Sequence, residues 1–389
     1  MKPRATRRPP KTRRQRAPAR RARLRSIGRA LPLVALAALL TLVLETIGGM
    51  RKIETATLDL QFSLLRGTRQ SPVALVLIPR DQLRAMFGGT SLAAAALNEL
   101  LKRIAAMRPR AIVVALDTSD PSFAAIRAPA GCPIIWSRGG EYSPRRGSFV
   151  TRPPAGGAHR ELVSGVAVQR IDSDKVVRRY EQVVQTDVGP QPTLPWAAVC
   201  AVTGKHPLRD ADPRNEFFLR WNAYAERFHP TAAAVLAMTA EVPANESNLL
   251  SGAIVVVGGD WNVADEHRTP VGWRLGSEIV AQAIETELAG RRIAPLSLPL
   301  LLLLQITQGV LLLLLFEVVS FRRALVISIV VVPLLSFGLS LLFFSTLSHW
   351  ATFAPILLVL IAERAHERIK ESRQKAVAAA EENLRMVQS

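Results

Sequence analysis

A long apolar stretch near the C-terminus, Leu296 to Ala362, limits the possible folds more than any other feature. It is interrupted only at Phe321–Arg323 and, weakly, at Ser345–Trp350. Runs of about twenty apolar residues can cross a bilayer as helices, which satisfy their own backbone groups in lipid. A buried soluble core would need three consecutive helices that are apolar all round. The stretch therefore predicts three transmembrane helices, which we place at Leu296–Val319, Ala324–Phe344 and Leu347–Ala362.

A further apolar run, Ala30–Leu44, follows a basic N-terminal segment. Met1–Arg29 contains thirteen Lys and Arg and no acid, so it supplies most of the net charge of +19. This composition is typical of a disordered tail. A signal peptide has the same order of charge and apolar run, but Glu45–Met50 offers no Ala-x-Ala pattern for a cleavage site. We therefore predict an uncleaved first transmembrane helix at residues 30–49.

The distribution of basic residues predicts the topology of the chain. Under the positive-inside rule, the tail Met1–Arg29, the Arg322–Arg323 loop and the helical tail Glu363–Ser389 are cytoplasmic. Residues 50–293 then form one extracytoplasmic domain, and the lipid bilayer is the first predicted partner. No nucleic-acid partner is expected, because no aromatic residues interleave the basic tail.

Hydrophobic patterns within residues 50–293 predict an α/β fold. The continuous apolar runs Pro72–Ile78, Arg110–Leu116 and Gly252–Gly258 are typical of strands covered on both faces. A helix predicted at Ser91–Met107, with Ser91 as its N-cap, makes a βαβ unit with the first two strands. The predicted fold is thus an α/β extracytoplasmic domain with a βαβ-containing mixed sheet, plus four transmembrane α-helices.

The remaining elements of the domain are predicted from shorter patterns. Asp172 and Asp174 resemble part of a calcium loop, but the Gly and distal Glu are missing, which favours simple turn chemistry. Asp59, on the first helix, is interpreted as a surface or cap residue. The predicted elements are a juxtamembrane helix Arg51–Leu65, a strand Pro133–Trp136, an exposed loop Gly139–His159, a β-hairpin with arms Ser164–Gln169 and Val176–Val184 around the Asp-rich turn, a helix Leu194–Thr203, a strand Glu216–Trp221, a polar loop Asp260–Pro270 and a helix Ser277–Leu288.

Polar residues at strand ends are the candidate ligand-binding residues. Asp117 ends the second strand, where open α/β sheets place their ligands, although a cap on the following turn explains it equally well. The polar loop adds Asp260, Asp265, Arg268 and Thr269, with a solvated loop as the more frequent alternative.

Catalytic and metal motifs are not found in the sequence. No Gly-x-Ser-x-Gly, P-loop or His-Glu-x-x-His motif occurs, so we expect no enzyme, no cofactor and no metal. An oxidising compartment would permit a bridge between Cys132 and Cys200, but two isolated cysteines are more often unpaired core residues.

Several of these stretches together resemble the CHASE type 2 domain, an extracytoplasmic sensory module of bacterial receptors. The most specific stretch runs from Gly252–Gly259 through Asp265 and Thr269-Pro270 to Gly276–Glu285. Asp172–Arg178 resembles the Asp-x-Asp-Gly turn and following Arg of the family, with Lys175 in place of the usual Gly, and Leu58-Asp59 with Gln61-Phe62 resembles its opening helix.

The resemblance implies a multi-pass sensor of the bacterial inner membrane with both termini in the cytoplasm. It would bind an unknown extracytoplasmic ligand and relay the signal through the membrane helices to a cytoplasmic signalling protein supplied in trans. A thin apolar stripe in Glu363–Ser389 permits a homodimer or a plain solvated helix. Two other hypotheses are a membrane-anchored scaffold without signalling output and, less favoured, a periplasmic hydrolase using the Asp260–His267 loop.

Overall fold

The computed structural model describes residues 51–64, 70–87, 93–126, 131–155, 163–221, 227, 229–237, 250–261, 265–290, 293–319 and 332–350, with a few isolated positions beyond these ranges. The chain forms two compact units, one comprising Leu58–Ala294 and the other comprising Met1–Thr57 with Pro295–Ser389. The expected first transmembrane helix at 30–49 lies outside the described residues, and so do residues 351–362 of the expected helix Leu347–Ala362 and nearly all of the tail Glu363–Ser389.

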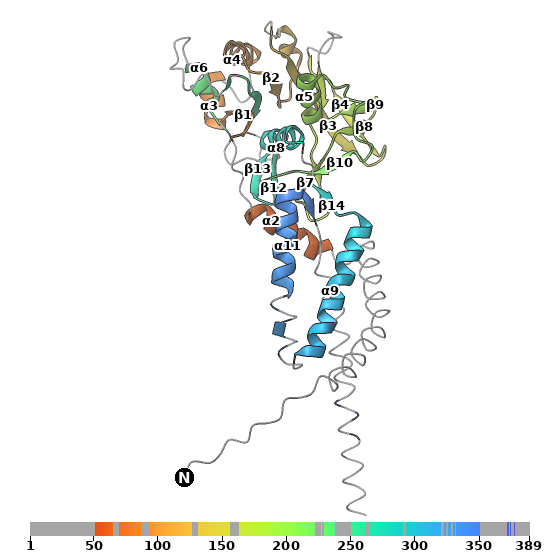
Figure 1. The fold of residues 1–389 in the computed structure, drawn as a ribbon. Coiled ribbons are helices and arrows are strands. Elements are labelled where there is room, and N and C mark those ends of the chain that lie inside the picture. The colour runs from red at the N-terminus through yellow and green to blue at the C-terminus, as the bar shows by residue number, and fades with distance from the viewer. Residues whose placement is uncertain are drawn as a thin grey trace, which may run out of the picture. The chain divides into compact units, whose positions relative to one another are not determined.

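A mixed eight-stranded sheet forms the centre of the unit Leu58–Ala294 (Figure 1). Its strand order is β1-β11-β2-β3-β4-β8-β9, with β5 paired to β3. Neighbours from β1 to β3 are parallel, as are β3–β5 and β4–β8, whereas β3–β4 and β8–β9 are antiparallel. The strands are β1 (Val73–Ile78), β2 (Ala111–Val114), β3 (Ile134–Ser143), β4 (Ser148–Arg152), β5 (Ser164–Val166), β8 (Val183–Thr186), β9 (Gly189–Pro192) and β11 (Ile254–Gly259).

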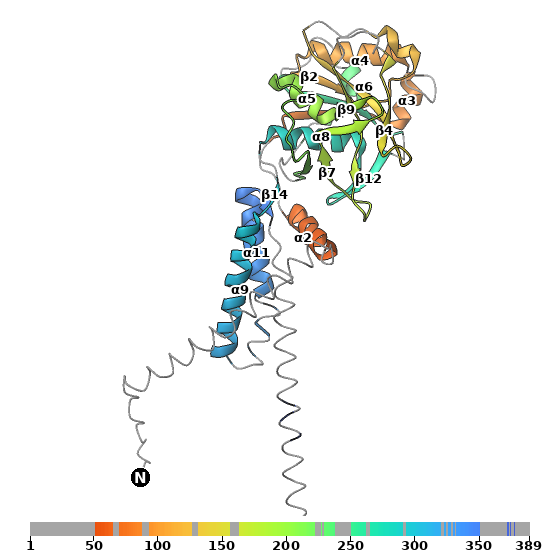
Figure 2. The ribbon, with the colours of Figure 1, turned by 90° about the vertical axis from the view of Figure 1, so that its right-hand side faces the viewer.

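Helices cover both faces of the parallel part of this sheet, as Figure 2 shows. Alternate residues of β1, β2 and β11 pack on one side against α3 (Arg80–Phe87), α4 (Ala94–Ala106) and α6 (Ala232–Ala237). On the other side they pack against α5 (Leu194–Thr203) and α8 (Gly276–Leu288). This double coverage is the physical reason why the three strands read as continuous apolar runs. It confirms the predicted α/β domain with a mixed sheet.

The predicted loop Gly139–His159 is wrong over most of its length. Ten-residue β3 continues to Ser143 and returns as β4 through a turn in which Gly147 has φ +62°. A Cβ on Gly140 would lie 2.9 Å from Cγ1 of Val166, so glycine at this position allows β3 and β5 to approach closely. From composition alone, the same glycine had been interpreted as part of an irregular loop. The Gly- and Arg-rich composition therefore belongs to a hairpin.

Two other expectations about strands are also corrected. The segment Ser164–Gln169 does not pair with Val176–Val184, because β5 lies parallel to β3 instead. The polar loop Asp260–Pro270 contains a strand, β12 (Glu266–Thr269), which pairs antiparallel with β13 (Gly272–Leu275).

The helices agree better with expectation. Helix α2 (Arg51–Leu64) matches the predicted juxtamembrane helix. Helix α4 begins after Ala93, which makes no side-chain cap, whereas the predicted cap Ser91 lies outside the described residues. The short helices α3, α6 and η2 (Pro121–Ala125) were not predicted. Cys132 and Cys200 are both buried and unbridged, in agreement with the unpaired alternative.

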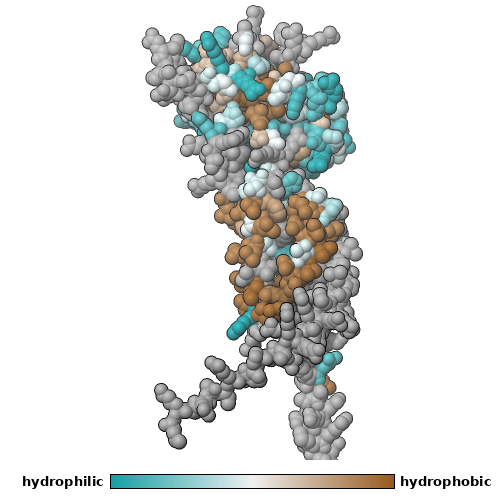
Figure 3. Space-filling view, viewed as in Figure 1, coloured by the Kyte–Doolittle hydropathy of each residue, from teal (hydrophilic) through white to brown (hydrophobic). Residues whose placement is uncertain are grey.

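The other unit contains mainly apolar helices. Its described elements are α9 (Leu298–Val318), α11 (Val332–Leu347) and β15 (His349–Trp350). Strand β15 pairs with β14 (Ala294–Pro295), which crosses the boundary between the two units. Gln308 Nε2 of α9 donates to Ser336 Oγ of α11 at 2.6 Å. Large apolar side chains, Leu303, Leu311, Leu334 and Leu335 among them, are exposed on these helices. Figure 3 shows the surface of this unit as mainly apolar. Within the part of the chain that the structure describes, no helix is both long enough and apolar enough to cross a membrane.

Candidate functional site

A small three-stranded sheet, separate from the large one, carries most of the ion pairs that connect described residues of the unit Leu58–Ala294. Its order is β10-β7-β6, formed by β6 (Arg170–Ile171), β7 (Val177–Glu181) and β10 (Glu216–Phe218), with both pairs antiparallel. The turn between β6 and β7 is closed by the backbone N–H of Asp172, which donates to Val176 O at 3.0 Å, and by the carboxylate of Asp174, which accepts from Val176 N at 3.3 Å. The predicted Asp-rich turn is therefore present.

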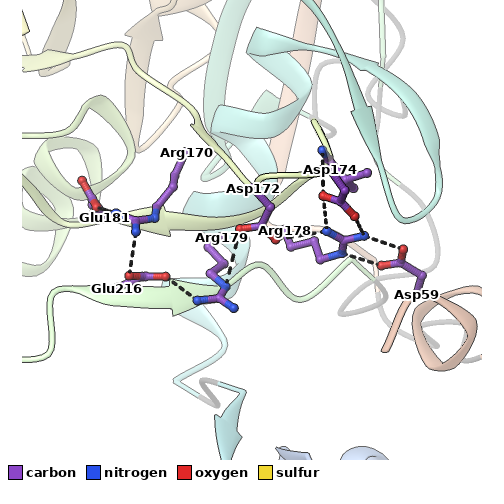
Figure 4. Close-up of polar contacts among 9 residues, drawn as sticks. Asp59, Arg170, Asp172, Asp174, Arg178, Arg179, Glu181 and Glu216 are labelled. Atoms are coloured by element: carbon purple, nitrogen blue, oxygen red, sulfur yellow. Dashed lines mark hydrogen bonds and ion pairs between the residues drawn. The ribbon is translucent and has the colours of Figure 1, made fainter. Parts of the chain in front are cut away.

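Arg178 of β7 lies at the centre of this cluster, only 2% exposed (Figure 4). Its guanidinium donates to both oxygens of Asp59 at 2.8 Å, to Asp174 at 2.7 and 2.9 Å and to Asp172 at 3.1 Å. Burial by itself would lower the pKa of Arg178, but the hydrogen bonds to the three carboxylates outweigh it and hold the pKa above its ordinary value. A buried cation with three acceptors is a fixed ion cluster that restrains every element bringing a carboxylate to it.

The carboxylates of the cluster differ in exposure. The side chain of Asp172 is 17% exposed, that of Asp59 is 29% and that of Asp174 is 44%. The hydrogen bond from Arg178 is the largest influence on Asp174 and lowers the pKa of that carboxyl. Three carboxylates therefore surround the Arg178 guanidinium, and one of them, Asp172, also lies 3.8 Å from Arg179 Nε.

A second ion network, joined to the first through Asp172, lies on the opposite side of β7. Arg179 Nη1 donates to Glu216 of β10 at 2.6 Å, and its guanidinium lies 4.4 Å from the centre of the Phe218 ring. Arg170 of β6 pairs with Glu216 at 3.3 Å and with Glu181 of β7. These side chains, drawn in Figure 4, cross-link all three strands. The small sheet is thus stabilised on one face by this network and on the other by Arg178.

Both ends of the unit Leu58–Ala294 are attached to this small sheet. At the incoming end, Asp59 belongs to α2, which continues from the neighbouring residues 51–57, and it is held by Arg178 of β7. At the outgoing end, Ile293 forms an antiparallel bridge with Phe218 of β10. A displacement between β7 and β10 would therefore shift the two ends relative to each other.

A second buried ion pair lies on α8. Glu285, 1% exposed, binds Arg227 through bonds of 2.8 Å to Nε and 2.7 Å to Nη2, and it also accepts from Ser71 Oγ. Arg227 in addition donates to Gln282 Oε1 at 3.2 Å. This pair joins the residues before β1 to α8 and satisfies a charge that would otherwise be buried alone.

The predicted ligand residues fall into two groups. Asp117 and Asp260 are exposed at the carboxyl ends of the neighbouring strands β2 and β11. Asp117 accepts from Ser119 N at 3.0 Å, which is the turn cap considered as its alternative explanation, and the backbone N–H of Asp260 donates to Ile78 O at 3.3 Å. Asp117 and Asp260 thus share one edge of the sheet.

The other three lie around the β12–β13 hairpin. Asp265 lies beside Gly276 at the start of α8, with its Oδ1 3.8 Å from His267 Nε2. Arg268 is exposed and bridges to Val176, next to the Asp-rich turn. Thr269 is buried and holds the tip of the hairpin, because its Oγ1 donates to Gly272 O at 2.6 Å. Among the described residues no group of His, Cys, Asp and Glu has the arrangement of a metal site.

Sequence reasoning missed the pairing of Arg178 with Asp59. Both residues belong to stretches singled out by the family resemblance, but they are separated by 119 positions. Asp59 was interpreted as a surface or cap residue, but its carboxylate forms an ion pair with a buried guanidinium. A usable signal was the Asp-x-Asp turn with an Arg four residues after its second Asp, which places three of the four charges on one hairpin.

The comparisons with known proteins give one result. The model of the CHASE2 domain family matches residues 34–319, about three quarters of the chain. No curated protein and no solved structure matches. The matched range includes α2, the eight-stranded and three-stranded sheets and α8.

Proposed function

Because the chain belongs to the CHASE2 family of extracellular sensory domains, we propose that it is a membrane-anchored sensor that passes a signal from its α/β domain to a cytoplasmic partner. The observation that carries this proposal is the small sheet β10-β7-β6, to which both ends of the domain are attached. A ligand alters such a sheet only if it binds one of two arrangements more tightly. The relay would then run from the sheet through α2 and the outgoing segment at Ile293.

The membrane part of the proposal is supported by the sequence. Apolar runs lie on both sides of the domain, and each short segment assigned to the cytoplasm contains Lys or Arg. We propose one span at residues 30–49, three within 296–362 and both termini in the cytoplasm of a bacterial cell. Protease added to spheroplasts should then cut within residues 50–293 and spare both termini. Cleavage of the termini alone would contradict this topology.

The ligand and the partner belong to the proposal as well. The carboxyl edge of the sheet, with Asp117 and Asp260, is a position where open α/β sheets bind ligands. A cytoplasmic signalling protein acting in trans would receive the signal through Glu363–Ser389, where two copies of the chain could also pair.

We propose no catalytic activity, so alanine at Asp265 and His267 should leave any hydrolysis by the purified protein unchanged.

Co-purification tests the signalling role against the scaffold alternative. Full-length protein and its Asp59→Asn variant are cross-linked in membranes, and the proteins bound to Glu363–Ser389 are quantified. A sensor requires that Asp59→Asn changes the amount of bound partner, because the variant weakens the attachment of α2 to β7. Arg152→Gln, which removes an exposed pair with Glu141 at 3.8 Å, is the matched control. Equal recovery from all three proteins would favour a scaffold.

A further inference from the structure

Exposed apolar side chains gather on the elements that meet at Arg178. Trp273 of β13 is 66% exposed, Ile171 of β6 is 51% exposed, and Leu60 and Leu64 of α2 are 48% and 54% exposed. Arg178 connects α2 to β7, β6 pairs with β7, and Val176 bridges to Arg268 of β12. Figures 1 and 2 both show β7 and β12 at the same end of their unit. Exposed apolar side chains on elements that adjoin one another are candidates for an interaction surface.

The β12–β13 hairpin has a composition suited to a lipid interface. Trp273 lies directly opposite Arg268 in the register, so the two side chains share one face of the hairpin. Its tip is Pro270-Val271-Gly272, held in shape by the Thr269 hydroxyl, which donates to Gly272 O and accepts from Val271 N. Trp is enriched at membrane–water interfaces, and Arg binds anionic headgroups there.

The position of this surface in the chain favours a membrane over a protein partner. The surface includes α2, which carries Asp59 at one end of the domain, and β6, which shares its sheet with β10, the strand that Ile293 bridges at the other end. Beyond these ends the sequence continues into the apolar runs Ala30–Leu44 and Leu296–Ala362. If those runs cross a bilayer, as the proposed function requires, this end of the domain is tethered beside the headgroups by short connections.

We propose that the β12–β13 hairpin, together with the exposed apolar residues of α2 and β6, docks onto the headgroup region of the outer surface of the bilayer. The inference rests on the membrane anchoring in the proposed function. Docking holds Arg268 at the lipid surface. Because Val176 bridges to Arg268, docking also holds the Asp-rich turn there. The ion cluster around Arg178 would thereby be coupled directly to the membrane as well as to α2.

The chain contains its own control for a test of this proposal. The turn between β8 and β9 repeats the turn of the β12–β13 hairpin, because Thr186 Oγ1 donates to Gly189 O at 2.6 Å and accepts from Val188 N at 3.3 Å, with the same distances as Thr269. The two glycines also have similar φ angles, +102° and +106°. Val271→Cys and Val188→Cys therefore place a probe in the same turn on two different hairpins.

The experiment uses full-length protein in lipid nanodiscs, with an environment-sensitive fluorescent label on the new cysteine. Cys132 and Cys200 should stay unlabelled, because both are buried and burial raises the pKa of each thiol. A quencher attached to lipid headgroups should quench the label at position 271 and leave the label at 188 unaffected. Replacing part of the phosphatidylcholine by phosphatidylglycerol should strengthen the quenching at 271. Arg268→Gln should then reduce the docked-to-undocked ratio about fivefold, the contribution of one Arg near an anionic surface.

Each other outcome overturns the inference or its premise. A label at 271 that stays unquenched, in protein that resists carbonate extraction from membranes, rejects docking while membrane anchoring stands. Protein that carbonate extracts rejects the anchoring itself. A blue-shifted label at 271 that lipid quenchers do not reach, and that persists in detergent, identifies a second copy of the chain as the occupant and rejects lipid. Quenching that survives Trp273→Ala at full strength rejects the role of the hairpin.

Discussion

Replacing Arg178 by methionine tests whether the ion cluster holds α2 to the small sheet. The change keeps most of the side-chain volume and removes the cation that binds Asp59, Asp172 and Asp174. Removing one partner of a buried ion pair typically costs 3–5 kcal/mol, and the partial exposure of the three carboxylates places this case at about 3 kcal/mol. That corresponds to an opening equilibrium of α2 about a hundredfold larger.

Hydrogen exchange of the full chain measures this local effect. The amides of residues 58–64 should exchange faster by about that factor, whereas those of β1 should change little, because regions of a protein open with different free energies. Asp59→Asn alone should lower the opening free energy of α2 by about 1–2 kcal/mol, since Arg178 keeps two other acceptors. The double variant should fall short of the summed effects by about 1–2 kcal/mol, because the two side chains touch.

A neighbouring arginine provides the control. Arg179 is one third exposed, pairs with Glu216 at 2.6 Å and lies only 3.8 Å from Asp172 Oδ1, so Arg179→Met should change the opening free energy of residues 58–64 by less than about 1 kcal/mol. If the opening free energy of this segment in Arg178→Met stays within about 0.5 kcal/mol of the value in the parent protein, the cluster does not hold α2. An equal effect of Arg179→Met would show that the strand, and not the cluster, is responsible.

Three further changes have defined outcomes. Because the pKa of Asp174 is lowered in the folded state, its contribution to stability is present above the unfolded value of about 4 and is lost as pH falls through the folded pKa. The protection of the α2 amides, relative to their intrinsic exchange rate at each pH, should therefore fall at acid pH, and it should fall less in Asp174→Asn. Lys175 has φ +63°, so Lys175→Gly should raise the melting temperature by relieving up to about 1 kcal/mol of backbone strain. A Cβ on Gly165 would lie 2.6 Å from Leu194 Cα, so Gly165→Ala should lower the melting temperature by destabilising the fold by about 1–3 kcal/mol, whereas Gly139→Ala, with 3.8 Å to its nearest neighbour, should not.

The parallel part of the large sheet could be predicted from sequence because its strands are buried on both sides. Continuous apolar runs identified β1, β2 and β11, and the helical periodicity before and after them identified α4 and α8. The apolar runs did not predict the order of these strands in the sheet. Strand β11 lies between β1 and β2, a pairing fixed by packing between distant segments and by no local pattern.

The site was harder to predict because its residues are individually ordinary. Asp172 and Asp174 are typical turn residues, and Asp59 is a typical helix surface residue. Their common partner becomes visible only when α2 and β7 meet. The residues that were selected, such as Asp117 and Asp260, stood out because they follow apolar runs, and that pattern also produces plain turn caps.

Strand β11 is central in the sheet but comes late in the sequence, and this limits how the domain can fold during synthesis. Val73 pairs with Ile254, so the middle of the sheet stays open until nearly the whole domain has been synthesised. A fragment ending before residue 254 would contain every charge of the Arg178 cluster and still lack the strand that joins β1 to β2. Such fragments should be substrates for chaperones and proteases, and the newly made chain depends on the same protection until its last third has appeared.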